Sequence, residues 1–467
     1  MDMKKICLCF LCALLVTAAA AQNIESAYRR PEKAYRYRVY LTDKDEKNNF
    51  YSLRRPEKFL SAKALERRKR FRIKVDEHDL PVSQIYLDYF RNQGFRVLHT
   101  SKWNNTVVVE TADTTQVRLL HEPRFVSQVR KIWESPDSVP VTDLSKRTEW
   151  VAQVCDTVAD YYGYAQRQVE MLNVPQLHRA GYRGKGLTIA IIDGGFLNAD
   201  CIDGLKSARI LGTRNFVRPA QSVYEEQSHG LMVLSCIGAN EPHTLVGTAP
   251  EAAFYLLVSE DSESEQLSEE DSWCAALEYA DSVGADIVTS SLGYNIYDAP
   301  GDTYHYYELD GNTALISKSA SMAASRGMLL LNSAGNSGDE PWKKISVPAD
   351  ADNILTVGAV TPEGTNANFS SVGYTADGRV KPDIVAQGES VALYSLNGTV
   401  VTADGTSFST PLLCGGVACL WQAFPDKTPL QIIDAVRRSG NNAAHPDNIY
   451  GYGIPNLWEA AQILQQE

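Results

Sequence analysis

From Val174 onward, short apolar strands alternate with helices, and this alternation constrains the fold more than any other feature of the chain. Strands are predicted at 187–192, 253–258, 287–290, 328–332 and 354–360, with helices that open at Ser228-His229-Gly230 and span 272–284 and 314–326. The first of these strands is a continuous apolar run, as expected of a strand that is buried on both faces. The pattern predicts an α/β domain built on a mostly parallel, doubly wound sheet.

The N-terminal part of the chain has a different element order. Strands are predicted at 37–41, 95–100, 105–111 and 126–133, and helices at 60–74, 82–93 and 114–120. Without the very basic first helix, the order is βαββαβ, which indicates a small α+β domain of the split β-α-β, ferredoxin-like kind. Residues 134–165 contain Pro136 and Pro140 in a polar stretch and are predicted to be a linker.

The first 21 residues have the three parts of a secretory signal. Lys4 and Lys5 precede an apolar run at 6–16, and Ala18 to Ala21 supply small residues before Gln22. The run is too short for a permanent membrane anchor, and no other stretch is apolar for long enough to span a bilayer. We therefore divide the chain into a signal peptide (1–21), an N-terminal domain with its linker (22–150) and a C-terminal domain (151–467). The protein is expected to be secreted or periplasmic, with cell-surface association left open.

The two domains carry opposite net charge. Residues 22–150 contain 26 Lys and Arg against 18 Asp and Glu, a net charge of +8, whereas residues 151–467 contain 17 against 38, a net charge of −21. Such opposed charges favour face-to-face docking that weakens with salt, around a contact between sheet and helices that should itself be apolar. In a secreted chain, the basic helix at 60–74 is predicted to face solvent or a protein partner rather than nucleic acid.

Cysteines and acidic residues give no metal motif. Six cysteines remain after the signal, scattered without metal-ligand spacing, so buried thiols are expected and one disulfide is left open. Acidic side chains at 259–271, and at Asp298, Asp302, Glu308 and Asp310, lack the spacing of a calcium-binding helix-loop-helix. Solvated acidic loops are the favoured interpretation. No cofactor is required and no metal ligand is assigned, while calcium binding stays open.

Three residues apt for acyl transfer fall at element ends. Asp193 follows a strand, His229 opens a helix, and Ser407 lies in GTSFSTP (405–411), just before a long apolar helix. Sites in open parallel sheets form beyond the carboxyl ends of the strands. A hydroxyl nucleophile needs an imidazole to accept its proton and a carboxylate to orient that imidazole. Each residue alone has an ordinary structural explanation as a cap or turn residue, but their joint occurrence favours a catalytic site.

Asn336 adds a donor to this set. It lies in the tight turn SAGNSG after another predicted strand, and its side-chain amide can stabilise a developing oxyanion together with the backbone N–H of Ser407.

The chain order Asp, His, Ser is that of subtilisin, and residues 170–465 resemble the subtilisin-like serine proteases (subtilases). The motifs that carry the resemblance are IAIIDGG around Asp193, SHG around His229, SSLG at 290–293, SAGNSG around Asn336, GTSFSTP around Ser407 and the run at 369–388.

The resemblance implies a serine-type endopeptidase that forms an acyl-enzyme, with Ser407 as nucleophile, His229 as general base and then acid, Asp193 as orienting residue and Asn336 as oxyanion donor. Ser291, Leu292 and Gly293 are implied to bind the substrate backbone. Residues 37–135 resemble the family prosegment in element order, which implies a proenzyme whose partners are protein or peptide substrates and its own prosegment.

Some positions depart from the family pattern. Gly194 replaces the usual Ser or Thr, Met232 replaces a second His, and Phe408-Ser409 stand where Met-Ala is commoner. None of these changes removes a catalytic group. An insertion at 294–312 lies beside the expected substrate cleft and leaves the specificity undefined.

Two other classes were weighed. A catalytically silent subtilase scaffold that binds peptides or protein partners is disfavoured because the four expected functional side chains are all present. A serine-carboxyl peptidase with a Glu base is excluded by His229 in its SHG motif. The sequence names neither the residue preferred at the cleaved bond nor the natural substrate.

Overall fold

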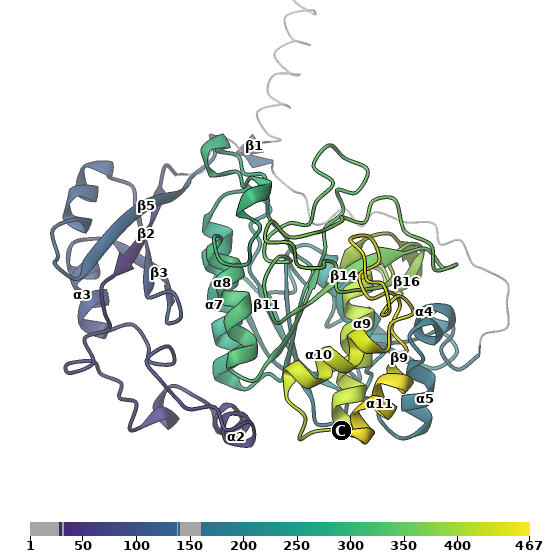
Figure 1. Ribbon diagram of the computed structural model, residues 1–467. Coiled ribbons are helices and arrows are strands. Elements are labelled where there is room, and N and C mark those ends of the chain that lie inside the picture. The colour runs from purple at the N-terminus through teal and green to yellow at the C-terminus, as the bar shows by residue number, and fades with distance from the viewer. Residues whose placement is uncertain (1–27, 30–31, 138, 141–159) are drawn as a thin grey trace, which may run out of the picture.

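The computed structural model describes residues 28–29, 32–137, 139–140 and 160–467, which form two units that lie side by side (Figure 1). The predicted signal at 1–21, residues 141–159 of the predicted linker, and Cys155 lie outside the described residues.

The C-terminal unit is built on a seven-stranded, wholly parallel sheet in the order β15-β14-β13-β12-β7-β11-β8. The strands are β7 (Thr188–Asp193), β8 (Arg209–Asn215), β11 (Ala253–Val258), β12 (Ile287–Ser290), β13 (Leu329–Ser333), β14 (Leu355–Val360) and β15 (Ile384–Gln387). The five predicted strands are confirmed to within one or two residues. The strands β8 and β15 were not predicted; β8 is a polar, half-exposed edge strand, and β15 is a short strand at the opposite edge of the sheet.

Helices cover both faces of this sheet, as predicted for a doubly wound fold. On the face toward the N-terminal unit lie α7 (Ser268–Val283) and α8 (Leu315–Ser325) (Figure 1). On the opposite face pack α6 (His229–Gly238) and α9 (Thr406–Ala423). Successive side chains of β7 alternate between the two layers: Ile189 and Ile191 join one apolar cluster, and Ala190 and Ile192 join the other.

Smaller elements complete this unit. They are α4 (Gln166–Met171), α5 (Val174–Arg179), α10 (Pro429–Arg438), α11 (Leu457–Gln466), the pairs β9 (Asn240–Glu241) with β10 (Leu245–Val246) and β16 (Val391–Tyr394) with β17 (Val400–Ala403), and the short 3₁₀ helices η3 (Asp203–Leu205), η4 (Pro300–Asp302) and η5 (Tyr306–Glu308). No described helix is long and apolar enough to cross a membrane.

The N-terminal unit has the predicted βαββαβ arrangement. Its antiparallel sheet, in the order β3-β4-β2-β5, consists of β2 (Tyr35–Leu41), β3 (Arg96–Ser101), β4 (Thr106–Thr111) and β5 (Val126–Glu134). The helical segments are η1 (Pro56–Lys58), α2 (Ala62–Arg70), α3 (Gln84–Asn92) and η2 (Thr114–Leu120), and β1 (Tyr28–Arg29) pairs with β6 (Val139–Pro140). The segment η2 is a 3₁₀ helix. The sheet packs on α3 around the fully buried Phe90.

The two units meet where this sheet faces α7 and α8, and the expectation of an apolar contact is only half right. Trp103, Val108 and Ile132 join the apolar cluster formed by α7 and α8. Buried charges cross the same interface, however. Arg38 Nη2 lies 2.6 Å from Asp271 Oδ2, and both side chains are almost fully buried. Because each charge meets an opposite charge and further hydrogen bonds, burial at this contact does not require apolar side chains.

Asp281 of α7 is the centre of the interface. Its Oδ1 lies 2.5 Å from Arg67 Nη2, and its Oδ2 lies 2.9 Å from both Arg68 Nη2 and Lys102 Nζ. Nearby, Glu278 accepts hydrogen bonds from the backbone N–H groups of Lys102 (2.7 Å) and Trp103 (3.1 Å). The basic helix α2 therefore faces a protein surface, the one supplied by this same chain.

The prediction of solvated acidic loops is wrong for much of 259–271. Asp261 Oδ1 lies 2.7 Å from Arg218 Nη2, and Glu270 accepts hydrogen bonds from the hydroxyls of Tyr297 and Tyr304 at 2.8 and 2.7 Å. Glu270 belongs to the first turn of α7, and the insertion at 294–312 contributes both of the tyrosine hydroxyls that bond it. The described residues contain no group of three or more His, Cys, Asp or Glu side chains arranged to hold a metal ion.

The described cysteines are mostly buried thiols, as expected. Cys236, Cys274, Cys414 and Cys419 are buried, whereas Cys201 is exposed. Burial raises the pKa of the Cys236 thiol and leaves it a poor nucleophile.

Candidate active site

Asp193 and His229 are hydrogen-bonded at the carboxyl edge of the sheet. Asp193 is the last residue of β7, and His229 is the first residue of α6; the His229 Nδ1 to Asp193 Oδ1 distance is 2.8 Å. Asp193 Oδ1 also accepts a hydrogen bond from Gly194 N at 2.8 Å, while Oδ2 is buried without a hydrogen-bond partner among the described residues. The arrangement fixes which ring nitrogen of His229 carries a proton and leaves Nε2 for proton transfer.

The environment of His229 favours its protonated form. Burial alone would lower the pKa of His229, but the charge of Asp193, the hydrogen bond to it and the charge of Glu260 outweigh burial and raise the pKa to about 9. The ring remains 32% exposed, so a substrate can reach it.

Ser407 lies at the start of α9, as predicted, in its first helical turn after Gly405. Its hydroxyl donates a 3.4 Å hydrogen bond to the Ser291 carbonyl, and Ser291 Oγ donates to the Ser407 carbonyl at 2.9 Å. The described residues show no hydrogen bond between Ser407 and His229. Phe408 follows Ser407, and its ring centroid lies 5.7 Å from that of His229. This contact brings the start of α6 close to the start of α9. Hydrogen bonds to a nucleophile are often long in unliganded sites and shorten when substrate binds.

Asn336 lies beside the same helix start. It follows β13, and its Oδ1 accepts hydrogen bonds from Thr406 N (2.9 Å) and Thr406 Oγ1 (2.8 Å). With the oxygen held by Thr406, the amide nitrogen Nδ2 lies 3.6 Å from the point that a Cβ on Gly405 would occupy. The side chain therefore offers an oriented N–H donor next to the backbone of Ser407.

The three residues expected to bind substrate backbone differ in exposure. Ser291 and Leu292 are buried, and the Leu292 carbonyl is already bonded to Asn332 Nδ2 at 3.0 Å. Gly293 is exposed, and a Cβ there would lie 2.3 Å from Ser346 Oγ. The accessible backbone of this segment is therefore at Gly293, and Ser291 contributes the carbonyl that accepts the hydrogen bond from the Ser407 hydroxyl.

Sequence reasoning missed two side chains at this edge, Glu260 and Gln227. Val258, the last residue of β11, is the register partner of Asp193 on the neighbouring strand, so Glu260 follows at the same edge of the sheet. Its place just after a strand next to β7 was the available signal, but the sequence interpretation included it in an acidic loop.

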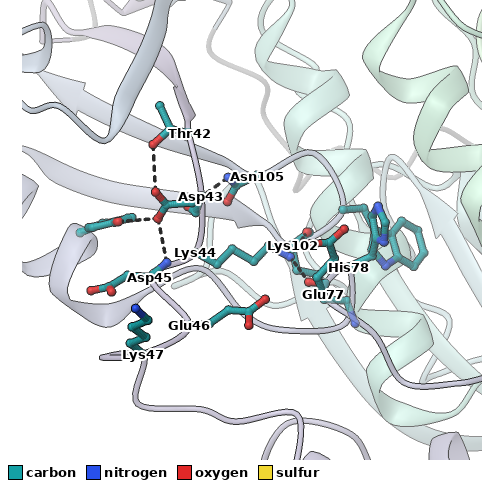
Figure 2. Close-up of a pocket in the computed structure, with 12 residues that line it drawn as sticks. Thr42, Asp43, Lys44, Asp45, Glu46, Lys47, Glu77, His78, Lys102 and Asn105 are labelled. Atoms are coloured by element: carbon teal, nitrogen blue, oxygen red, sulfur yellow. Dashed lines mark hydrogen bonds between the residues drawn. The ribbon is translucent and has the colours of Figure 1, made fainter.

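A separate cavity of about 590 Å³ lies in the N-terminal unit, away from these residues (Figure 2). Lys44 Nζ donates to the carbonyls of Glu77 and Lys102, and Asp43 accepts from Tyr86 (2.6 Å) and from the backbone of Asp45 (2.8 Å). Burial lowers the pKa of Lys44 to about 8. The polar groups of Asp43 and Lys44 in this cavity are thus bonded within the N-terminal unit.

Comparison with protein families gives two matches. Residues 184–453 match the family model described as Peptidase_S8, subtilase family, and residues 36–149 match the model described as the Peptidase S8 propeptide domain of Bacteroidota.

Comparison with individual proteins agrees with these matches. The chain is 30% identical to subtilisin NAT of Bacillus subtilis subsp. natto over 300 residues, 63% of this chain and 70% of the relative. It is 27% identical to the alkaline protease of Shouchella clausii over 362 residues, 77% of this chain and 85% of the relative. Similarity to the subtilisin of Bacillus pumilus is 29% over 298 residues, which cover 63% of this chain and 98% of the relative.

Proposed function

The chain belongs to the subtilase family and is a serine endopeptidase with a propeptide domain, and we propose that Asp193, His229 and Ser407 are its catalytic triad. The single observation that carries the proposal is the 2.8 Å hydrogen bond between Asp193 and His229, at the sheet edge where α9 presents Ser407. In this mechanism His229 accepts the Ser407 proton as Oγ attacks the peptide carbonyl.

The oxyanion formed in that step is stabilised by Asn336 Nδ2 and the backbone N–H of Ser407, at the N-terminus of α9. His229 then donates its proton to the leaving amine, and water hydrolyses the acyl-enzyme by the reverse sequence. The backbone from Ser291 to Gly293 pairs with the extended substrate, mainly through the exposed Gly293.

A catalytically silent scaffold that binds peptides is the competing function. Reaction with a fluorophosphonate probe separates the two, because only an activated serine forms the covalent adduct. We expect wild-type protein to be labelled at Ser407 and S407A to stay unlabelled. Unlabelled, inactive wild-type protein after removal of residues 22–150 would contradict the proposal.

We further propose that 1–21 is a signal peptide for secretion, that 22–150 assists folding and inhibits the enzyme until it is cut off, and that 151–467 is the mature protease. The buried ion pairs of Asp281 support tight docking of the N-terminal unit. A permanently attached accessory domain is the alternative.

Self-cleavage provides the test of this maturation. The junction falls in residues that the structure does not describe, so the cut site has to be mapped by mass spectrometry. We expect S407A to remain at full secreted length and wild type to release the 22–150 fragment. A separately produced 151–467 fragment that folds and cleaves normally, and is not slowed by added 22–150, would show that the N-terminal unit has neither role.

A further inference from the structure

Two side-chain oxygens converge on Gly194, the residue after Asp193. Glu260 Oε2 lies 2.6 Å, and Gln227 Oε1 lies 2.4 Å, from the point that a Cβ on residue 194 would occupy. Only glycine leaves that space to them. The glycine that replaces the usual Ser or Thr at position 194 is therefore linked to the position of Glu260, because a side chain at 194 would push both oxygens aside.

Neither oxygen is bonded to another described residue. Glu260 is partly buried, and only burial and the charges of its neighbours act on its carboxylate, with no hydrogen bond. The Gln227 side chain likewise has no hydrogen-bond partner in the part of the chain that the structure describes. Both oxygens therefore lie close together against Gly194 and keep their lone pairs free, so they offer two neighbouring acceptors to a cation or an N–H donor that approaches from outside the chain.

The charges that face Glu260 are mostly negative. Asp193 lies on β7, Asp261 is its sequence neighbour, and Glu265 and Glu269 are near enough to be affected by its charge, whereas His229 is the one cation that acts on it among the described residues. Burial and then the charge of Asp193 raise the pKa of Glu260 to about 7, with His229 opposing them. An unpaired buried charge is costly, so a cation from outside the chain would be bound favourably.

The nearby arginine does not fill this role. Arg218 lies 2.7 Å from Asp261, 3.2 Å from Glu226 and 3.2 Å from Glu263, so its guanidinium is already shared among three carboxylates. Glu260 is not among the carboxylates that this arginine neutralises.

We propose that Glu260, assisted by the Gln227 amide oxygen, is a specificity-determining residue that binds a Lys or Arg side chain of the substrate close to the scissile bond. The inference rests on the proposed function, because it places this pair beside the Asp193–His229 hydrogen bond. One carboxylate and one amide oxygen are too few ligands for Ca²⁺, which takes six to eight oxygens. They suit an ammonium or guanidinium group, whose N–H donors form charge-assisted hydrogen bonds.

The test compares peptides that differ only in carrying Lys or Leu at each position around the cleaved bond. We expect wild-type enzyme to prefer Lys at one position by roughly ten- to a hundredfold in kcat/KM, and E260Q to lose that preference at the same position. E225Q is the matched control, since Glu225 is an exposed carboxylate on the segment before His229 and its loss should leave the Lys-to-Leu ratio unchanged.

Three further readouts distinguish recognition from a structural role. E260R should invert the preference toward Asp or Glu at that position. G194S should reduce the Lys preference by displacing the Glu260 carboxylate. In wild type, the Lys-to-Leu ratio should rise between pH 6 and 8, as Glu260 loses its proton.

Equal hydrolysis of Lys and Leu peptides at every position by active wild type, or a Lys preference that survives in E260Q, would overturn this inference alone. Failure of wild type to react with the fluorophosphonate or to cleave any peptide would overturn the proposed function instead.

Discussion

Two buried aspartates in this protein have opposite electrostatic surroundings. Asp281, at the contact between the units, faces Arg67, Arg68 and Lys102. Burial would raise the pKa of Asp281, but these three cations hold it well below the usual range for a carboxyl group. Asp193 has the imidazole of His229 and one backbone N–H, while its second oxygen is unpaired.

The difference separates a charge that joins the two units from one that we propose to act in catalysis. At Asp281 the surrounding cations outnumber the acid, so the group stays ionised and holds two units together. At Asp193 the acids outnumber the fixed cations, because Glu260 lies beside the same imidazole. The excess negative charge acts on His229 and is available to a substrate. The groups with raised pKa values, His229 and Glu260, therefore lie at the edge of the sheet that we propose to be reactive.

The largest expected effect comes from removing the nucleophile. S407A should lower kcat for peptide hydrolysis by about a millionfold, the size measured for the equivalent loss in subtilisin itself. Steady-state hydrolysis by protein free of contaminating protease measures it. Near-normal activity would show that the edge around Asp193 is not the reactive one.

Loss of the side-chain oxyanion donor should be smaller. N336L should reduce kcat by about a hundredfold or more, again the range known from subtilisin, with little change in KM because the donor acts mainly on the transition state. The leucine cannot replace the hydrogen bonds from Thr406, so the fold of the variant is checked by its thermal unfolding. A variant that raises KM and leaves kcat unchanged would contradict the oxyanion role.

Asp281 should contribute to docking of the N-terminal unit and not to peptide hydrolysis. In an S407A background that stays uncut, D281N should weaken docking of the N-terminal unit by about 3 kcal/mol or more, because it leaves buried cations without a carboxylate. Hydrogen exchange of α2 and β4 measures the opening of the interface.

The half-exposed pair of Arg130 and Asp302, at 2.8 Å, provides the matched control for D281N. D302N should cost about 1 kcal/mol or less and be more sensitive to salt. Equal effects of D281N and D302N would mean that the buried ion pairs of Asp281 have no special part in holding the two units together.

The pH dependence of kcat/KM should reveal the excess negative charge around His229. Its pKa of about 9 means that the neutral imidazole is lost as pH falls, so kcat/KM should drop about tenfold per pH unit on the acid side. E260Q should move the midpoint to lower pH because it removes a charge that raises the pKa. A profile that is flat from pH 5 to 9 would rule out His229 as the general base.

Sequence patterns were sufficient for most of the elements and for the places of the proposed site residues on them. Apolar runs located the five central strands, and short motifs placed Asp193, His229 and Ser407 at element ends. The edge strand β8 was not predicted because its side chains are polar and half exposed. The contact between the two units was expected to be apolar. Composition gives the net charge of each domain, but it does not show which arginine lies against which aspartate.

What the sequence by itself determined was therefore local: the alternation of strands and helices, the βαββαβ order of the N-terminal unit, and the residue types at the ends of the strands. Tertiary structure alone decided the long-range pairings. Arg68 meets Asp281 across 213 positions, and Glu260 reaches the space left by Gly194 only because β7 and β11 are neighbours in register. The physical reason is that periodicity and turn chemistry are encoded in adjacent residues, whereas the electrostatic state of a carboxylate depends on every charge that the folded chain brings near it.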